Sequence, residues 1–187
     1  MPAVALGQLH PSITQLAQID RDQYQIGHIL TDYLLRQRCS RLLVLLRDTV
    51  TCGDHCFLDA IMATCSEAKW ETDRVRIRCF PADADAVQAG VATALTRRKT
   101  GLLCRNEQLA EAAIAGAAQS AGSTNCLAAV ADVYRSKTPR FASAAAVIPP
   151  EEFGRQTGRV LLESTGPDDV APARTLIPVE LKLPTDG

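Results

Sequence analysis

The sequence predicts an α/β fold, a parallel sheet with helices on both faces. Short apolar runs of strand length alternate with longer amphipathic stretches of helical period. Four of the apolar runs begin about 26 to 33 residues apart with a helix in each gap, which is the spacing of βαβ units. The chain has 187 residues, 47% of them hydrophobic, and is long enough to bury a core without metals or disulfides.

The first predicted helix covers residues 21–37, where an apolar stripe at helical spacing includes Ile26 and Leu30. Asp20, with Gln23 three residues later, is predicted to form a capping box at its start. The residues before this helix hold two short apolar pieces and no helix of their own.

The middle of the chain predicts three strands and two helices. The run 41–46 is apolar throughout after its first residue, which favours a strand buried on both faces. The run 75–80 alternates apolar and basic residues, which favours a strand exposed on one face and near a sheet edge. Helical spacing of apolar residues predicts helices over 54–67 and 84–98, and a third strand follows over 101–104.

The last part of the chain continues the alternation. Asn106 is a good N-cap for a helix that runs to about residue 121. Three more strands are predicted over 127–130, 144–148 and about 175–179, and a further helix over 150–162. The segments 137–142 and 165–172 are predicted to be loops or crossings.

Charge and cysteine content limit the classes of protein to which this sequence can belong. The net charge of −1 gives no electrostatic footprint of a nucleic-acid binder. The seven cysteines are an odd number and most lie in apolar segments, so buried free thiols are expected. The N-terminus does not resemble a secretory signal, and no apolar run is long enough to span a membrane. A cytoplasmic, reducing location is therefore expected.

Candidate binding residues follow the strands, because ligands of an open parallel sheet bind outside the carboxyl ends of its strands. Three segments qualify: 52–56, 105–108 and 131–135. They bear polar side chains suited to a small polar molecule, and the candidate ligand-binding residues are Asn106, Asp132, Asp54 and Tyr134. A purely structural role is equally open, with Asn106 capping its helix and Asp132 starting a turn.

Other chemistries find less support. Cys52-Gly-Asp-His-Cys56 has no second ligand pair elsewhere in the sequence, so no metal site is expected. A Cys–His nucleophile could be formed by Cys52 or Cys56 with His55. Such a pair needs a specific side-chain geometry, which adjacency in the sequence does not provide. No glycine-rich phosphate loop occurs, so no cofactor and no enzymatic activity are expected.

Several segments resemble, in order and with matching spacing, the effector-binding domain of the LacI/GalR family of transcriptional regulators. Gly101-Leu-Leu-Cys-Arg-Asn-Glu-Gln-Leu-Ala110 is similar to the family's strand followed by Asn-Asp-x-x-Ala. Phe57-Leu-Asp-Ala60 resembles its Gly-Phe-x-x-Ala, and Leu176-Ile-Pro-Val-Glu-Leu181 its closing Leu-Pro-x-x-Leu strand. The resemblance covers about residues 15 to 183.

The resemblance implies a periplasmic-binding-protein type I-like lobe with a partial second lobe. Residues 1–19 would be a remnant of the first lobe or a crossover, 20–136 the main effector-binding lobe, and 137–187 a closing strand-helix-strand segment shared between lobes. Asn106 and Asp132 match family positions that bind effector. Gly53 stands where the family has an effector-binding Arg, and Cys56 where it has the Gly before Phe.

The resemblance also implies partners. A small-molecule effector, sugar-like or related, would bind in the cleft, and family members are usually homodimers. The family's DNA-binding head has no counterpart before Met1, so DNA contact is expected only through a separate N-terminal module. A small parallel α/β enzyme with its active loop at 53–56, a degenerate paralogue that binds nothing, and a stand-alone periplasmic-type binding protein stay open, the last disfavoured by the absent signal peptide.

Overall fold

The computed structural model describes residues 3–120, 125–132, 140–164 and 173–184. The strands are β1 (Val4–Leu6), β2 (Ala17–Arg21), β3 (Arg41–Arg47), β4 (Val75–Phe80), β5 (Thr100–Asn106), β6 (Cys126–Asp132), β7 (Ala142–Ala146), β8 (Arg174–Ile177) and β9 (Val179–Lys182). The helices are α1 (Gln23–Arg36), α2 (Cys52–Glu67), α3 (Ala84–Ala94), α4 (Glu107–Ala118) and α5 (Pro150–Glu163), with a short 3-10 helix η1 at Thr72–Arg74. Within these residues, no helix is both long and apolar enough to cross a bilayer.

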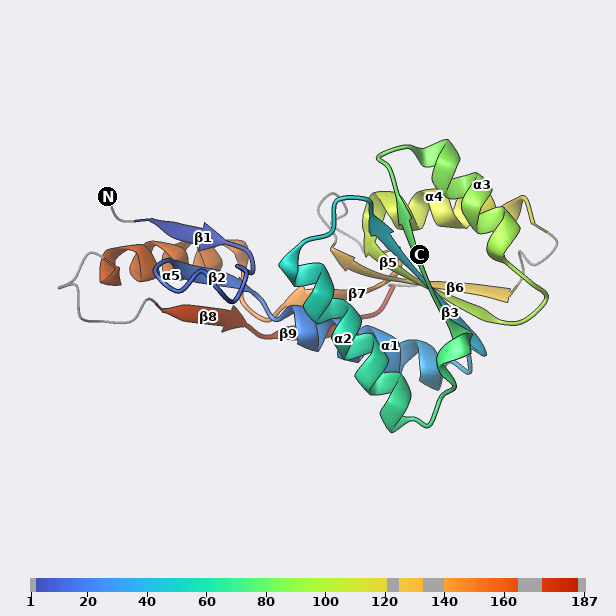
Figure 1. The fold of residues 1–187 in the computed structure, drawn as a ribbon, viewed down its shortest axis with the longest axis horizontal. Coiled ribbons are helices and arrows are strands. Elements are labelled where there is room, and N and C mark those ends of the chain that lie inside the picture. The colour runs from blue at the N-terminus through green and yellow to red at the C-terminus, as the bar shows by residue number, and fades with distance from the viewer. Residues whose placement is uncertain (1–2, 121–124, 133–139, 165–172, 185–187) are drawn as a thin grey trace.

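Two sheets lie side by side along the molecule (Figure 1). The large sheet has six strands in the order β4-β3-β5-β6-β7-β9, and the small sheet has three in the order β1-β2-β8. β3, β4, β5, β6 and β7 are parallel, as the βαβ repetition predicts. β9 runs antiparallel to β7, so the predicted parallel sheet ends in one antiparallel edge strand.

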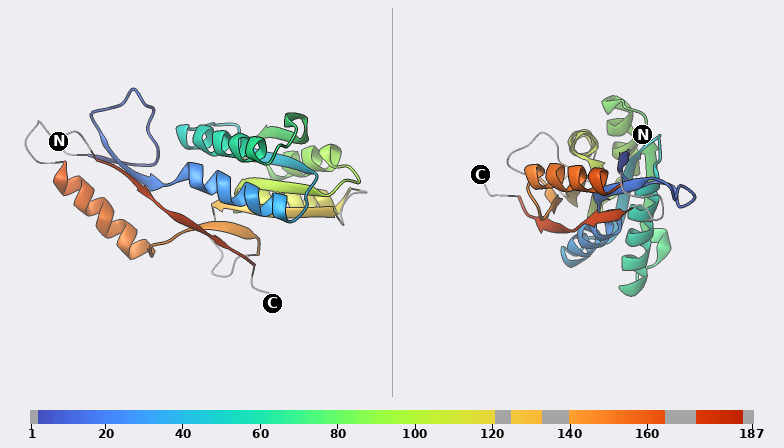
Figure 2. Two further views of the ribbon diagram at one scale, coloured as in Figure 1. Left: turned by 90° about the horizontal axis from the view of Figure 1, so that it is seen from below. Right: turned by 90° about the vertical axis from the view of Figure 1, so that its left-hand side faces the viewer.

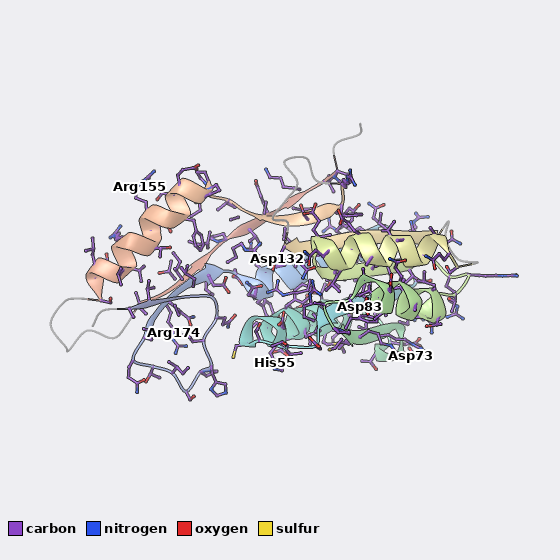
Figure 3. All side chains as sticks on the ribbon, turned by 90° about the horizontal axis from the view of Figure 1, so that it is seen from above. His55, Asp73, Asp83, Asp132, Arg155 and Arg174 are labelled. Carbon is purple, nitrogen blue, oxygen red and sulfur yellow. The ribbon has the colours of Figure 1, made fainter. Side chains whose placement is uncertain are left out.

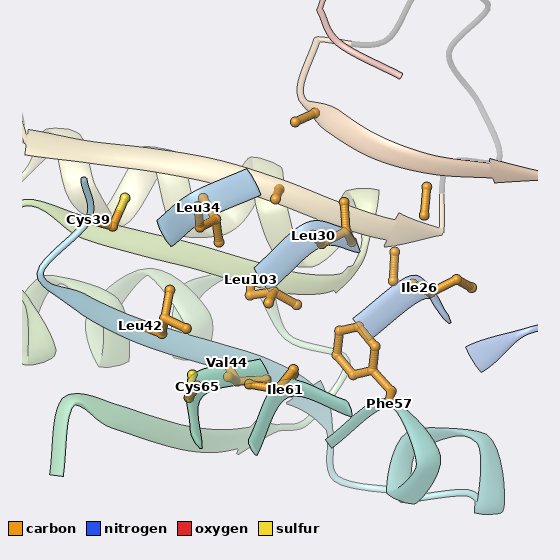
Figure 4. Close-up of a cluster of buried hydrophobic side chains, with 14 of the residues drawn as sticks. Ile26, Leu30, Leu34, Cys39, Leu42, Val44, Phe57, Ile61, Cys65 and Leu103 are labelled. Carbon is orange, nitrogen blue, oxygen red and sulfur yellow. The ribbon is translucent and has the colours of Figure 1, made fainter. Parts of the chain in front are cut away.

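Helices cover both faces of the large sheet, which confirms the predicted fold class. One core cluster joins α1 and α2 to the sheet through Ile26, Leu30, Phe57, Ile61 and Val44, all of them fully buried (Figure 4). The second joins α3 and α4 to the other face. Burying apolar side chains on both faces is the main stabilisation of such a sheet, at about 25 cal/mol for each Å² removed from water.

Close helix packing beside the small sheet depends on a glycine. A Cβ on Gly27 of α1 would lie 2.5 Å from the carbonyl oxygen of Phe57 and 2.9 Å from the Cβ of Ala60 in α2. Only a residue without a side chain allows the two helices to approach this closely. Gly27 therefore brings the start of α1 against α2, next to the carboxyl ends of β5 and β6.

The small sheet is covered on one face by α5, which contacts β1 and β2. Figure 2 shows that α5 and this sheet occupy one end of the molecule, with β7 and the β8–β9 strands running between the two ends. The second face is approached by the segment after β1, because the backbone N–H of Leu9 donates to Gln18 at 3.0 Å and Arg174 donates to the carbonyl of Ile13 at 3.1 Å.

Pro178 divides the single strand predicted at 175–179 into β8 and β9. Proline has no N–H for a sheet ladder, and the chain leaves the small sheet at Ile177 and joins the large sheet at Val179. The other predicted strands are present, with boundaries shifted by a few residues. The predicted loop 165–172 and residues 137–139 of the predicted loop 137–142 lie outside the described residues, while Ala142 begins β7.

Several helix boundaries differ from the predictions by one to four residues, and α4 ends at Ala118 instead of about 121. α1 is capped by Asp22, whose carboxylate accepts from the N–H of Gln25 at 2.8 Å, and not by Asp20. The predicted box fails because β2 continues to Arg21, which places Gln23 at the first helical position instead of the third. α2 begins at Cys52 instead of 54, and α3 ends at Ala94 instead of 98, where the backbone becomes extended.

The cysteine prediction is confirmed only in part. Cys39, Cys65 and Cys104 are buried free thiols, and Cys52, Cys56 and Cys126 are half-buried. Cys79 is exposed, because it lies on β4, the outermost strand of the large sheet. The prediction that residues 75–80 form a strand near a sheet edge is confirmed by that position. The prediction of exposure on one face only is wrong, because residues 76–79 of this outermost strand are all exposed.

Candidate functional site

A cavity of about 550 Å³ lies between the two sheets and is called here the intersheet cavity. Its volume falls in the range of small-molecule sites. The small-sheet side is lined by Leu6, Gln8 and Phe153, and the large-sheet side by Gly53, Arg105 and Asp132. The cavity therefore lies outside the carboxyl ends of β5 and β6, where the parallel-sheet rule predicts a ligand.

Arg105 is the most connected side chain at this cavity. Its Nε donates to Asp54 at 2.5 Å, its Nη1 to Asp132 at 3.2 Å and its Nη2 to Gln23 at 2.9 Å. The guanidinium also lies 5.5 Å from the centre of the Phe57 ring, within the range of a cation–π contact. One side chain of β5 thus joins α1, α2 and β6.

Asp132 accepts from a second guanidinium, that of Arg21 at the end of β2. Arg21 also donates to the carbonyl oxygen of Ala131 at 3.2 Å. Because Arg21 leaves the small sheet and Asp132 ends a strand of the large sheet, this ion pair crosses the junction between the sheets. Figure 3 shows Asp132 at that junction.

Gly53 leaves room for this arrangement. A Cβ at position 53 would lie 3.3 Å from the Cγ of Gln23 and 3.7 Å from the Nη2 of Arg105. Any side chain longer than a methyl group would press on the amide and the guanidinium that occupy this space. The guanidinium of Arg105 therefore lies beside the position where the resembling family carries its own Arg.

Asp54 has two structural partners. Its carboxylate accepts from the backbone N–H and the hydroxyl of Thr51, both at 2.8 Å, which completes a capping box for α2. Burial alone would raise the pKa of Asp54, but these hydrogen bonds and the Arg105 guanidinium outweigh burial and hold the pKa below its ordinary value. Asp54 is therefore ionised at neutral pH and fixes the direction of Arg105.

A lowered pKa predicts acid-sensitive stability. The contribution of Asp54 is complete above the pKa of an unfolded Asp, about 3.9, and is lost as the pH falls through the lower folded value. We expect the free energy of unfolding to fall below about pH 5, by about 1.4 kcal/mol for each unit of pKa shift. Urea denaturation from pH 7 to pH 3 measures this loss, and Asp54→Asn is expected to reduce its slope. An unchanged slope in that variant would contradict the assignment.

The predicted site residues have different environments. Asp132 lines the intersheet cavity, and Asp54 forms an ion pair with Arg105, which also lines it. Asn106 is the N-cap of α4, where its Oδ1 accepts from the N–H of Leu109 at 3.0 Å, so the predicted cap is confirmed. Asn106 and Asp132 are register partners on β5 and β6, which places them side by side. Tyr134 lies outside the described residues.

Cys56, one of the two candidate nucleophiles of the segment 52–56, lies in an environment that disfavours its thiolate. Burial, as the largest cause, raises the pKa of the Cys56 thiol, and its Sγ lies 2.9 Å from the Nε2 of Gln8. A thiol with a raised pKa is a poor nucleophile at neutral pH. Over the described ranges, no group of three or more His, Cys, Asp or Glu residues is placed to hold a metal ion.

Arg21, Gln23 and Arg105 make most of the polar contacts at the cavity, and none of them is among the four predicted ligand-binding residues. Arg105 directly precedes Asn106 at the end of a strand, which was a usable signal. Arg21 gave no local signal, because its partner Asp132 is 111 residues away in the sequence.

Comparisons with known proteins show the fold. Neither a scan against models of protein families nor a search of curated proteins finds a match to the sequence. Solved structures do match. A regulatory protein of the LacI family from Chloroflexus aggregans has a TM-score of 0.78 and 19% identity, with 100% of this chain and 69% of that chain covered.

Two other matches contain sugars. A LacI-family regulator from Enterococcus faecium with bound ribose has a TM-score of 0.77 and 14% identity, covering 98% of this chain and 69% of that one. A periplasmic binding protein/LacI regulator from Alkaliphilus metalliredigens, complexed with D-xylulofuranose, has a TM-score of 0.74 and 15% identity, covering 98% and 70%. This chain thus spans about two thirds of the length of such structures, and it has the fold of LacI-family transcriptional regulators.

Proposed function

We propose that this chain is the ligand-sensing part of a LacI-type transcriptional regulator, and that a small polar effector binds in the intersheet cavity. The observation that carries the proposal is the network of Arg105, Asp132 and Arg21, which lies at the carboxyl ends of β5 and β6 and faces the small sheet. The fold shared with sugar-bound regulators supports it.

The charges of the site favour an uncharged ligand that carries hydroxyl groups. Arg21 and Arg105 are paired with Asp54 and Asp132, and Asp20 accepts from the Gln23 amide at 2.9 Å. An ionic ligand would have to displace one member of these pairs from its partner. A hydroxyl group both donates to a carboxylate and accepts from a guanidinium, so it fits such a network without separating charges.

The ion pair across the junction suggests how a signal would arise. Arg21 and Asp132 belong to different sheets, so a ligand that bonds to both favours one arrangement of the sheets over others. The ligand shifts the equilibrium between two arrangements of the sheets by a free energy equal to the difference between its binding free energies for them. The proposal also includes a homodimer, a cytoplasmic location and a DNA-binding head on a separate module. The raised pKa of the Cys56 thiol disfavours the alternative of an enzyme with its active loop at 53–56.

A thermal-shift screen with sugars, polyols and purines tests the proposal. A ligand at about 100 times its Kd stabilises the folded state by about 2.7 kcal/mol, which corresponds to a rise in Tm of about 5–10 °C for a chain of this size. We expect at least one pentose or related polyol to produce such a rise. No rise with any compound would instead support the alternative of a paralogue that binds nothing.

A further inference from the structure

The outer edge of β4 is open. β4 is the first strand in the order of the large sheet, where it pairs with β3, and residues 76–79 are all exposed. The side chain of Ile77 keeps 44% of its surface accessible. Over the described residues, no strand pairs with the outer side of β4, so its outward backbone N–H and C=O groups are available to an added strand.

The side chains of β4 alternate in charge between the two faces of the sheet. Arg76 and Arg78 are register partners of Leu43 and Leu45, which belong to the core cluster under α3 and α4. Ile77 is the partner of Val44, which belongs to the cluster under α1 and α2. The open edge therefore presents two guanidinium groups on one face and an exposed apolar side chain on the other.

Arg76 and Arg78 form no ion pair with another described residue. Arg36, Arg74, Arg155 and Arg159 each form an ion pair with a carboxylate close by in sequence. The exposed Arg38, Arg97 and Arg98 are unpaired in the same sense, but they lie on turns or bends and not on the open edge of a strand. Arg41, which begins the neighbouring strand β3, adds positive charge at the start of the same edge.

We propose that the β4 edge binds an acidic peptide in extended conformation, which adds to the large sheet as a further strand. Its carboxylates would contact Arg76 and Arg78 on one face, and its alternate apolar residues would contact Ile77 on the other. The backbone supplies hydrogen bonds and the alternating side chains supply specificity. The β4 edge would thus recognise peptides in which acidic and apolar residues alternate.

A second copy of this chain fits the edge poorly. In an antiparallel pair of β4 strands centred on Ile77, with each face of the sheet continuous, Arg76 of one chain would lie opposite Arg78 of the other. Like charges directly opposite each other destabilise a sheet. The same charges that prevent such pairing attract a strand of opposite charge, so charge selects the acidic partner.

The other edge of the large sheet provides an internal comparison. On β9, Lys182 and Glu180 form an ion pair at 2.5 Å, so this edge carries no net charge of its own. Among the described residues, neither edge strand has a partner on its outer side, and the two edges differ in charge. An acidic peptide should therefore choose β4 over β9.

The test uses a synthetic peptide of about ten residues that alternates Glu with Val, a length that covers a typical strand. Its affinity is measured by fluorescence anisotropy at low salt, and its position by amide hydrogen exchange. We expect protection of residues 75–80 and weaker binding at high salt, where surface charges are screened. The double variant Arg76→Glu/Arg78→Glu should lose about tenfold in affinity or more, since two ion pairs with the peptide are removed and charge reversal adds repulsion.

The matched control is Arg155→Glu/Arg159→Glu on α5, which changes charge equally at exposed positions away from β4 and should bind the peptide as before. The Arg76/Arg78 variant should in turn prefer a peptide in which Lys replaces Glu. The proposal is overturned if the two double variants bind the acidic peptide equally, if protection appears on β9 instead, or if amide exchange at residues 75–80 depends only on protein concentration, which indicates a second copy.

Discussion

Replacing Arg105 with Leu is expected to cost about 3–5 kcal/mol of unfolding free energy. The side chains of Asp54 and Asp132 keep only 9% and 11% of their surface accessible, so both carboxylates would remain buried with less compensation. Removing one partner of a buried ion pair is far more costly than the net stabilisation by the pair, because an uncompensated charge stays behind. Urea denaturation at pH 7 measures the loss.

The pH dependence separates this cause from simple loss of packing. Arg105 is one of the groups that lower the pKa of Asp54, so without it Asp54 would take up a proton at higher pH, and the deficit of Arg105→Leu should shrink as the pH is lowered toward 4. Arg155→Leu on α5 is the control, because its exposed pair with Glu152 contributes at most about 1 kcal/mol. A deficit for Arg105→Leu no larger than that of the control would show that the network does not hold the site together.

Replacing Phe57 with Ala is expected to have a comparable effect, about 3–5 kcal/mol. The side chain is fully buried in the cluster under α1 and α2. Its ring also lies beneath the guanidinium of Arg105, so the variant removes both a large apolar group and a cation–π contact. Phe57→Leu keeps most of the volume and should cost clearly less.

The contact with Arg105 can be measured separately by a double-mutant cycle. If ring and guanidinium interact, Phe57→Leu and Arg105→Leu together should cost less than the sum of the two, by about 0.5–1 kcal/mol. Strict additivity would mean that the ring supports the core of α1 and α2 and has no role in placing the guanidinium.

Local patterns predicted the elements well because their causes are local. The alternation of Val75-Arg-Ile-Arg-Cys-Phe80 identified an edge strand, and Asn106 identified a helix start, each from a few neighbouring residues. The capping box at Asp20 failed for a long-range reason. β2 pairs with β8 through Arg21 and Ile177, which extends the strand and delays the helix.

The sequence predicted the location of the candidate site more than its composition. The rule for parallel sheets selected the carboxyl ends of β5 and β6, and the structure has a cavity there that Asp132 lines. The network itself depends on Arg21 and Gln23 reaching residues far along the chain, and such contacts leave no periodic signal in a sequence. Gly53 was noted as a missing arginine, whereas the structure shows Arg105 of a neighbouring strand beside that position.

The central claim is that Asp132 and Arg105 bind a polar effector in the intersheet cavity, and calorimetric titration of the compound that gives the largest thermal shift tests it most directly. The unaltered chain is compared with Asp132→Asn and with Gly158→Ala, a change on α5 where an added Cβ meets no atom within 4 Å. We predict a loss of about 10- to 100-fold in affinity for Asp132→Asn, the range for a hydrogen bond to a charged group, and none for Gly158→Ala. Equal affinity of all three proteins would contradict the account.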